Sequence, residues 1–89
     1  MNTYVVSYDL INQKNYEGLI EEIKSSYGTW AKPLESFWLV KTSSSASQIR
    51  DELKKVLDKD DKLIVIEVGS FCATYNVSNE VTAWIHDNI

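Results

Sequence analysis

Residues 3–9 read Thr-Tyr-Val-Val-Ser-Tyr-Asp, a run of β-branched and aromatic side chains with partial alternation of apolar and polar positions. Such side chains suit a half-buried pleated surface, so the run predicts a β-strand. The strand is expected to stop at Asp9, because a polar run over residues 12–15 follows it. The segment thus supplies the first strand and places a carboxylate at its end.

An amphipathic helix is expected next, over residues 16–27. Its apolar side chains recur at helical spacing, and its acidic side chains lie on the opposite face. Asn15 is the expected N-cap and Gly28 the expected stop.

Residues 29–42 are rich in tryptophan and other strand-forming side chains but contain Pro33. Proline lacks the N–H that a β-ladder needs. We therefore expect a short strand over 29–32, a connection over 33–35 and a longer strand over 36–42.

A second helix is predicted from Ser45, because Gln48 three residues later completes a capping box before an apolar stripe that ends at Leu57. After a polar turn over residues 58–61, the nearly continuous apolar run 63–68 is typical of a strand in the interior of a sheet.

The C-terminal part is expected to form a short helix capped by Ser78, with Val81, Trp84 and Ile85 on one face. Gly69 and Ser70 break the preceding strand. Residues 71–77, which lie between this break and the helix, are ambiguous, and one option for them is an edge strand.

The predicted order is β-α-β-β-α-β with an extended segment and a helix appended. Right-handed crossovers then give an α+β, ferredoxin-like antiparallel sheet with both helices on one face. We expect a single domain over residues 1–89, with its core in 1–68 and a C-terminal segment in 69–89. The other sheet face needs a cover, either the C-terminal segment with Trp84 or a second subunit.

Composition narrows the classes of function. The chain has 89 residues, 44% hydrophobic and 25% charged, which is typical of a folded globular domain. A domain this small has a thin core, so docking with a second copy would stabilise it. A net charge of −4 argues against a broad basic face for nucleic acid.

Cysteine and histidine content excludes other classes. With Cys72 as the single cysteine and His86 as the single histidine, neither an intramolecular disulfide nor a Cys/His zinc site within one chain can form. The N-terminus has no signal-like run, and no apolar stretch is long enough to span a membrane. We expect a cytoplasmic protein with no membrane association.

Asp9 is the most informative candidate site residue, because a strand end holds a side chain rigidly. Two interpretations are open. It could bind Mg²⁺ together with Asp9 of a second chain, since Mg²⁺ commonly takes one or two carboxylates plus water. It could instead cap the turn or the helix start near Asn12.

The other candidates favour structural roles. Asp60 and Asp61 fit a solvated turn, and Glu67 fits an edge or dimer face. His86 is expected on the surface, and Cys72 as a small buried hydrophobe. The remaining candidates are the tryptophans, for which packing or a dimer interface is favoured over base stacking: Trp30, Trp38 and Trp84.

A family resemblance rests on five features: the strand ending Tyr8-Asp9, the amphipathic helix, the Trp-containing strand, the Ser36-Phe37-Trp38 strand and the apolar strand 63–68. In this order over residues 1–68, the chain resembles the small CRISPR-associated protein of the spacer-integration complex and the virulence-associated protein D toxins. The stretch from Ala73 to Ile85 is more similar to their short SinR-like bacterial relatives.

The resemblance implies a homodimer of ferredoxin-like protomers in which Asp9 of each chain faces the other. It implies Asp9 as the ligand for Mg²⁺ or Mn²⁺ and Ser36 as a second catalytic residue of an endonuclease acting on RNA or DNA. The acidic charge and the sole arginine, Arg50, weaken nucleic-acid binding. The alternative is therefore a non-catalytic homodimeric module that binds protein.

Overall fold

The computed structural model describes residues 1–10, 17–70 and 72–89. Within them it contains one four-stranded antiparallel sheet and three α-helices, so the protein is of the α+β class. The strands are β1 (Asn2–Asp9), β2 (Thr29–Leu34), β3 (Phe37–Thr42) and β4 (Lys62–Glu67). The helices are α1 (Glu17–Ser26), α2 (Ala46–Leu53) and α3 (Asn79–Asn88), and a 3₁₀ turn, Lys54–Val56, follows α2.

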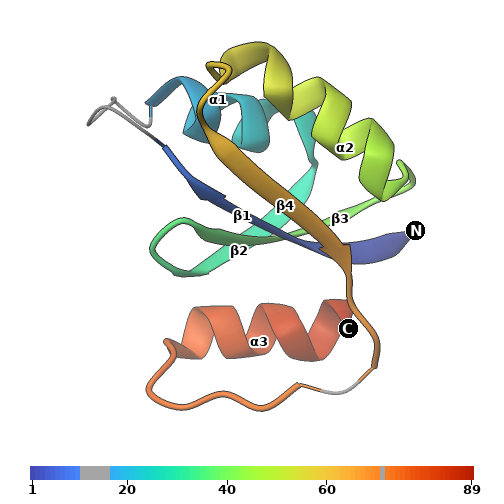
Figure 1. The fold of residues 1–89 in the computed structure, drawn as a ribbon. Coiled ribbons are helices and arrows are strands. Elements are labelled where there is room, and N and C mark those ends of the chain that lie inside the picture. The colour runs from blue at the N-terminus through green and yellow to red at the C-terminus, as the bar shows by residue number, and fades with distance from the viewer. Residues whose placement is uncertain (11–16, 71) are drawn as a thin grey trace.

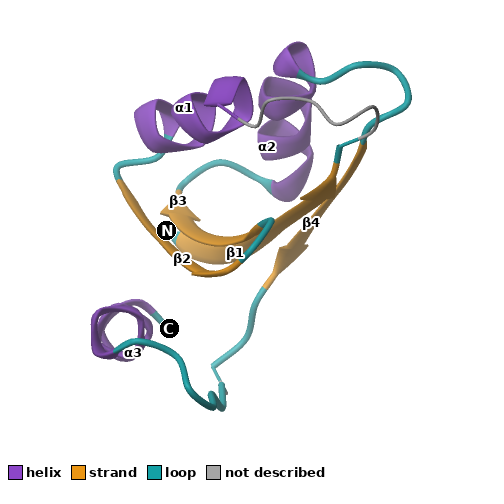
Figure 2. Cartoon of the chain, turned by 90° about the vertical axis from the view of Figure 1, so that its left-hand side faces the viewer, coloured by secondary structure: helices purple, strands orange, loops and turns teal. Residues whose placement is uncertain are grey.

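The sheet has the order β2-β3-β1-β4, and every neighbouring pair is antiparallel. Helices α1 and α2 cover one face, here called the upper face, and α3 lies against the other, the lower face (Figures 1 and 2). The two central strands are β1 and β3, whereas β2 and β4 form the edges.

The core lies between the upper face and the two helices. Alternate residues of β1 and β3 point into it, because successive side chains of a strand lie on opposite faces. The buried side chains that form this cluster are Tyr4, Val6, Tyr8, Leu19, Ile23, Tyr27, Trp38, Val40, Ile49 and Leu53. The first strand and most of the apolar positions of α1 and α2 are therefore confirmed as core elements, whereas Val56, predicted for the second stripe, is 44% exposed.

Helix caps follow the sequence. The Ser45 hydroxyl accepts from the Gln48 N–H at 3.2 Å, and the Gln48 side chain accepts from the Ser45 N–H at 2.7 Å, which confirms the capping box. Ser78 caps α3 through the Val81 N–H. The expected N-cap Asn15 lies outside the described residues.

The second strand differs from the prediction. We expected it to end at Lys32, but β2 continues through Pro33 to Leu34, with a register shift between Ala31 and Leu34. A proline is tolerated there because β2 is an edge strand with an irregularity in its pairing. Ser36, expected to open the next strand, lies instead in the turn, with φ of 55°.

The last strand also corrects an expectation. The apolar run 63–68 was expected inside the sheet, but β4 lies at an edge. Leu63 and Val65 pack against the core, whereas Ile64 is 54% and Ile66 50% exposed. An uninterrupted apolar run has no polar side chain that would indicate a solvent-exposed face. The sequence of β4 therefore does not distinguish an edge strand from an interior one, and its place in the sheet follows from its pairing with β1.

The C-terminal segment supplies the cover of the lower face near β2. The Trp84 indole Nε1 donates to the Thr29 hydroxyl at 2.9 Å, and the Thr3 hydroxyl donates to the Asn88 carbonyl at 2.8 Å. No strand occurs among the described residues between Ser70 and Ser78, so the edge-strand option for residues 71–77 is not supported there. Cys72 is exposed, and the expectation that it is a buried hydrophobe is wrong.

Tyr27 provides a pH-dependent test of the core. Its side chain is 3% exposed, and its hydroxyl has no hydrogen-bond partner among the described residues. Burial, with smaller contributions from the Glu52 and Glu22 carboxylates, raises the pKa of Tyr27 from 10.0 to about 12. The unfolded chain therefore loses the Tyr27 proton first as the pH rises.

We expect the free energy of unfolding to fall between pH 10 and 12, by on the order of 2 kcal/mol from this group, because the folded state keeps the proton that the unfolded state releases. Tyr27→Phe should lack this component in denaturant unfolding measured across that range. Tyr75→Phe, at a position 87% exposed, is the control and should behave like the wild type. A parallel decline in Tyr27→Phe would contradict the assignment.

No helix among the described residues is both long and apolar enough to cross a membrane.

Candidate functional site

Asp9 lies at the end of β1, opposite Lys62 at the start of β4. Paired residues of an antiparallel ladder share a face, so the carboxylate and the ammonium group lie on the lower face together. A shallow hollow of about 240 Å³ is formed there by Ser7, Tyr8, Asp9, Lys62, Leu63 and Ile64. Asp9 itself is exposed, so a ligand can reach it from solvent.

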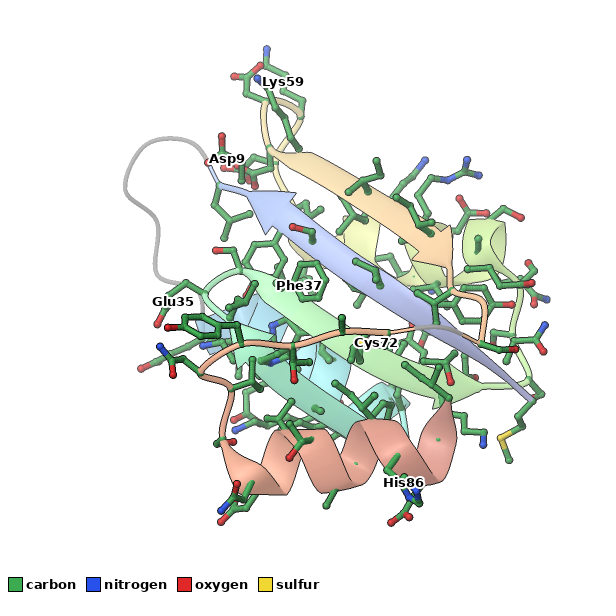
Figure 3. The ribbon with its side chains drawn as sticks, turned by 90° about the horizontal axis from the view of Figure 1, so that it is seen from below. Asp9, Glu35, Phe37, Lys59, Cys72 and His86 are labelled. Carbon is green, nitrogen blue, oxygen red and sulfur yellow. The ribbon has the colours of Figure 1, made fainter. Side chains whose placement is uncertain are left out.

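Ser36, the second predicted site residue, is brought to the same end of the sheet. Its carbonyl accepts from the Ser7 hydroxyl at 3.0 Å and from the Tyr8 N–H at 3.2 Å. These two bonds tie the β2–β3 turn to the last residues of β1. Figure 3 shows Asp9 and the neighbouring turn residue Glu35 at this end of the molecule.

The donor set around Asp9 is small. One chain contributes one carboxylate, beside the cationic Lys62. Over residues 1–10, 17–70 and 72–89, no three His, Cys, Asp or Glu side chains gather as a group that could hold a metal ion. A magnesium site here needs oxygen ligands from a second chain, from water or from a phosphate.

Other acidic candidates have structural partners. The Asp61 carboxylate accepts from the Asp58 N–H at 2.8 Å, which agrees with a polar turn over these residues. Glu67 is exposed and accepts from the Asn2 side chain at 3.1 Å, as expected for an edge position. His86 has a side chain 90% exposed, which confirms its expected place on the surface.

Sequence reasoning missed two features of the lower face. Nothing in the sequence indicates Lys62 as a site residue, because only the register of β1 with β4 places it beside Asp9. An apolar groove of about 340 Å³ also lies between the sheet and the segment after β4, lined in part by Phe37, Leu39 and Tyr75. The ambiguity of residues 71–77 in the sequence hid this groove.

Together, these observations define a small α+β protein with an open carboxylate at a sheet end and a lower face that α3 covers in part. Neither a protein-family model nor a curated protein matches the chain.

Proposed function

We propose that the chain is a ferredoxin-like, homodimeric protein-interaction module. The ferredoxin-like arrangement is supported by the order β1-α1-β2-β3-α2-β4, by the sheet order and by the placement of α1 and α2 on one face. A reducing compartment such as the cytoplasm suits its single free cysteine.

The observation that carries the proposal is the apolar, uncovered part of the lower face along β4. Ile64 and Ile66, both on the lower face of β4, are 54% and 50% exposed. A small domain gains stability when such side chains are buried by a partner. The net charge of −4 and the sole arginine favour a protein partner over nucleic acid.

A homodimer is tested by sedimentation equilibrium of the purified chain over a wide range of concentration. We expect a monomer–dimer equilibrium whose dimer predominates at tens of micromolar, by analogy with weak, specific interfaces. A mass that stays monomeric up to the highest soluble concentration would contradict the proposal.

A second candidate is favoured by the position of Asp9, Lys62 and the Ser36 turn at the same end of the sheet, where Asp9 and Lys62 line one hollow and Ser36 another. It is a metal-dependent endonuclease for RNA or DNA, in which Asp9 from two chains holds Mg²⁺ or Mn²⁺. A divalent cation bound there would activate water and neutralise charge on the phosphate. Asp9 would orient the cation, Lys62 would attract the phosphodiester, and the Ser36 turn would fix the end of β1.

The two candidates are separated by incubating the chain with labelled single-stranded RNA and DNA in Mg²⁺, Mn²⁺ or chelator. The module predicts no cleavage that depends on Asp9. The endonuclease predicts cleavage that falls at least about tenfold in Asp9→Asn, while the matched variant Asp87→Asn, on the exposed side of α3, leaves it unchanged. Cleavage that survives both the chelator and Asp9→Asn would exclude the metal role.

A further inference from the structure

The backbone of β4 has a defined free edge. The Val68 N–H donates to the Thr3 carbonyl at 2.9 Å, just beyond the β1–β4 ladder. Backbone groups alternate in direction along an antiparallel strand, so Ile64 and Ile66 bond inward to β1. The N–H and C=O groups of Leu63, Val65 and Glu67 are therefore directed outward.

This edge is also open in space. The described chain has no strand beyond β4 in the sheet order, and Figure 3 shows α3 near the opposite edge, beside β2. Unpaired strand edges are templates for pairing with another chain, and proteins usually protect them with lysine, proline or a bulge. Between its end residues Lys62 and Glu67, β4 carries only apolar side chains.

We propose that β4 pairs antiparallel with β4 of a second copy, about a two-fold axis through Val65. Each Val65 then lies opposite the Val65 of the other copy, and Leu63 lies opposite Glu67. In this register the outward N–H and C=O groups of Leu63, Val65 and Glu67 all find hydrogen-bond partners on the other copy. They do so because hydrogen-bonded pairs recur at every second residue of an antiparallel ladder. The pairing joins two four-stranded sheets into one continuous sheet.

The same register brings the exposed isoleucines together. Ile64 of one copy lies opposite Ile66 of the other on the lower face, in the type of pair whose side chains approach most closely. Side chains that are 54% and 50% exposed in one chain would thus cover each other. An axis through Ile64 would instead place Lys62 of one copy opposite Ile66 of the other. A one-residue slip would pair lower-face side chains of one copy with upper-face side chains of the other.

The charged side chains near β4 on the upper face, Arg50 and Glu67, also agree with this register. Arg50 of α2 helps to line a hollow of about 300 Å³ beside Leu63, Ile64 and Val65. Glu67 of the second copy would lie opposite Leu63 and therefore next to Arg50. Within one chain Arg50 already bonds the Asp51 carboxylate at 2.9 Å; in the dimer this sole arginine would also meet Glu67 of the other copy, once on each side of the axis.

The inference rests on the homodimer of the proposed function and names its interface. It also separates that homodimer from the one required by the endonuclease. Asp9 pairs with Lys62, near the start of β4, so the β4 pairing places the two Asp9 carboxylates on opposite sides of the axis.

The test is sedimentation equilibrium of the full chain and of charge variants, with circular dichroism to verify folding. Ile64→Lys should raise the dimer dissociation constant at least about tenfold, because it introduces a charge into two symmetric contacts. Leu34→Lys is the matched control: Leu34 is 58% exposed but lies on β2, the opposite edge, and should leave the constant unchanged.

A charge exchange tests the register itself. Arg50→Glu and Glu67→Arg should each weaken the dimer, since each places like charges together, and the double variant should restore it. If the wild type is monomeric, the homodimer and this interface both fail. If it is dimeric but insensitive to Ile64→Lys and to the charge exchange, the homodimer stands and the β4 interface is wrong.

Discussion

Trp38→Ala is expected to lower the free energy of unfolding by about 3–5 kcal/mol, the usual range for a large aromatic side chain removed from a core. Trp38 is 1% exposed and lies at the centre of the upper face. Its indole Nε1 donates to the Tyr8 hydroxyl at 3.1 Å, and its ring meets that of Trp30 edge to face at 5.1 Å. The substitution removes packing from both central strands and leaves the buried Tyr8 hydroxyl without this donor.

Thermal and denaturant unfolding measure the effect. For a domain of this size, the loss corresponds to a fall in Tm of more than about 12 °C, and a total stability of about 5–15 kcal/mol makes partial unfolding at 37 °C the expected result. Trp38→Phe, which keeps most of the volume but not the N–H donor, should cost clearly less. Equal losses in both variants would show that the hydrogen bond, rather than the ring volume, dominates.

Trp84→Ala is expected to cost about 2 kcal/mol, less than Trp38→Ala because the side chain is only half buried. It removes the bond from the Trp84 indole to the Thr29 hydroxyl and the packing of α3 against the sheet. The bond between Thr3 and Asn88 remains, so α3 should loosen without the upper core unfolding.

Hydrogen exchange distinguishes local loosening from a general loss of stability. Amides of residues 79–88 should exchange faster in Trp84→Ala, while those of β1 and β3 keep most of their protection. His86→Ala, on the exposed side of the same helix, is the control and should change neither measurement. Uniformly faster exchange through β1 and β3 would show instead that α3 is part of the global folding unit.

Local sequence patterns predicted the helices and the packing roles of Trp38 and Trp84, but not the residues that these side chains contact. The helical stripe after residue 16 and the capping box at Ser45 act over a few residues, so local spacing predicted α1 and α2. The same holds for α3, whose N-cap Ser78 was expected. Packing roles for Trp38 and Trp84 were also predicted, although nothing in the sequence named their partners.

Errors occurred where a local pattern allowed two tertiary solutions. Pro33 predicts that the second strand ends before it, yet an edge strand with an irregular register accommodates this proline. Cys72 was expected inside but is exposed, because no strand forms among the described residues around it to bury its side chain. The run 63–68 was placed inside the sheet, and its exposed isoleucines now form the proposed interface.

The candidate site was predicted only in its individual residues. Asp9 at a strand end followed from the residues themselves, and Ser36 from the resemblance. Their proximity depends on the carbonyl of Ser36 accepting from Ser7 and Tyr8, a contact between distant parts of the chain. Lys62 lies beside Asp9 only because of the register between β1 and β4.

Local sequence patterns predict the kinds of elements, their order and the N-caps Ser45 and Ser78, because β-branched alternation, helical stripes and capping side chains act within a few residues. The three-dimensional fold was needed to show which strand is an edge, which part of the lower face α3 covers and which groups surround Asp9. Those outcomes depend on pairing and burial between residues far apart in the chain, and an apolar run such as β4 satisfies the local rules in more than one place.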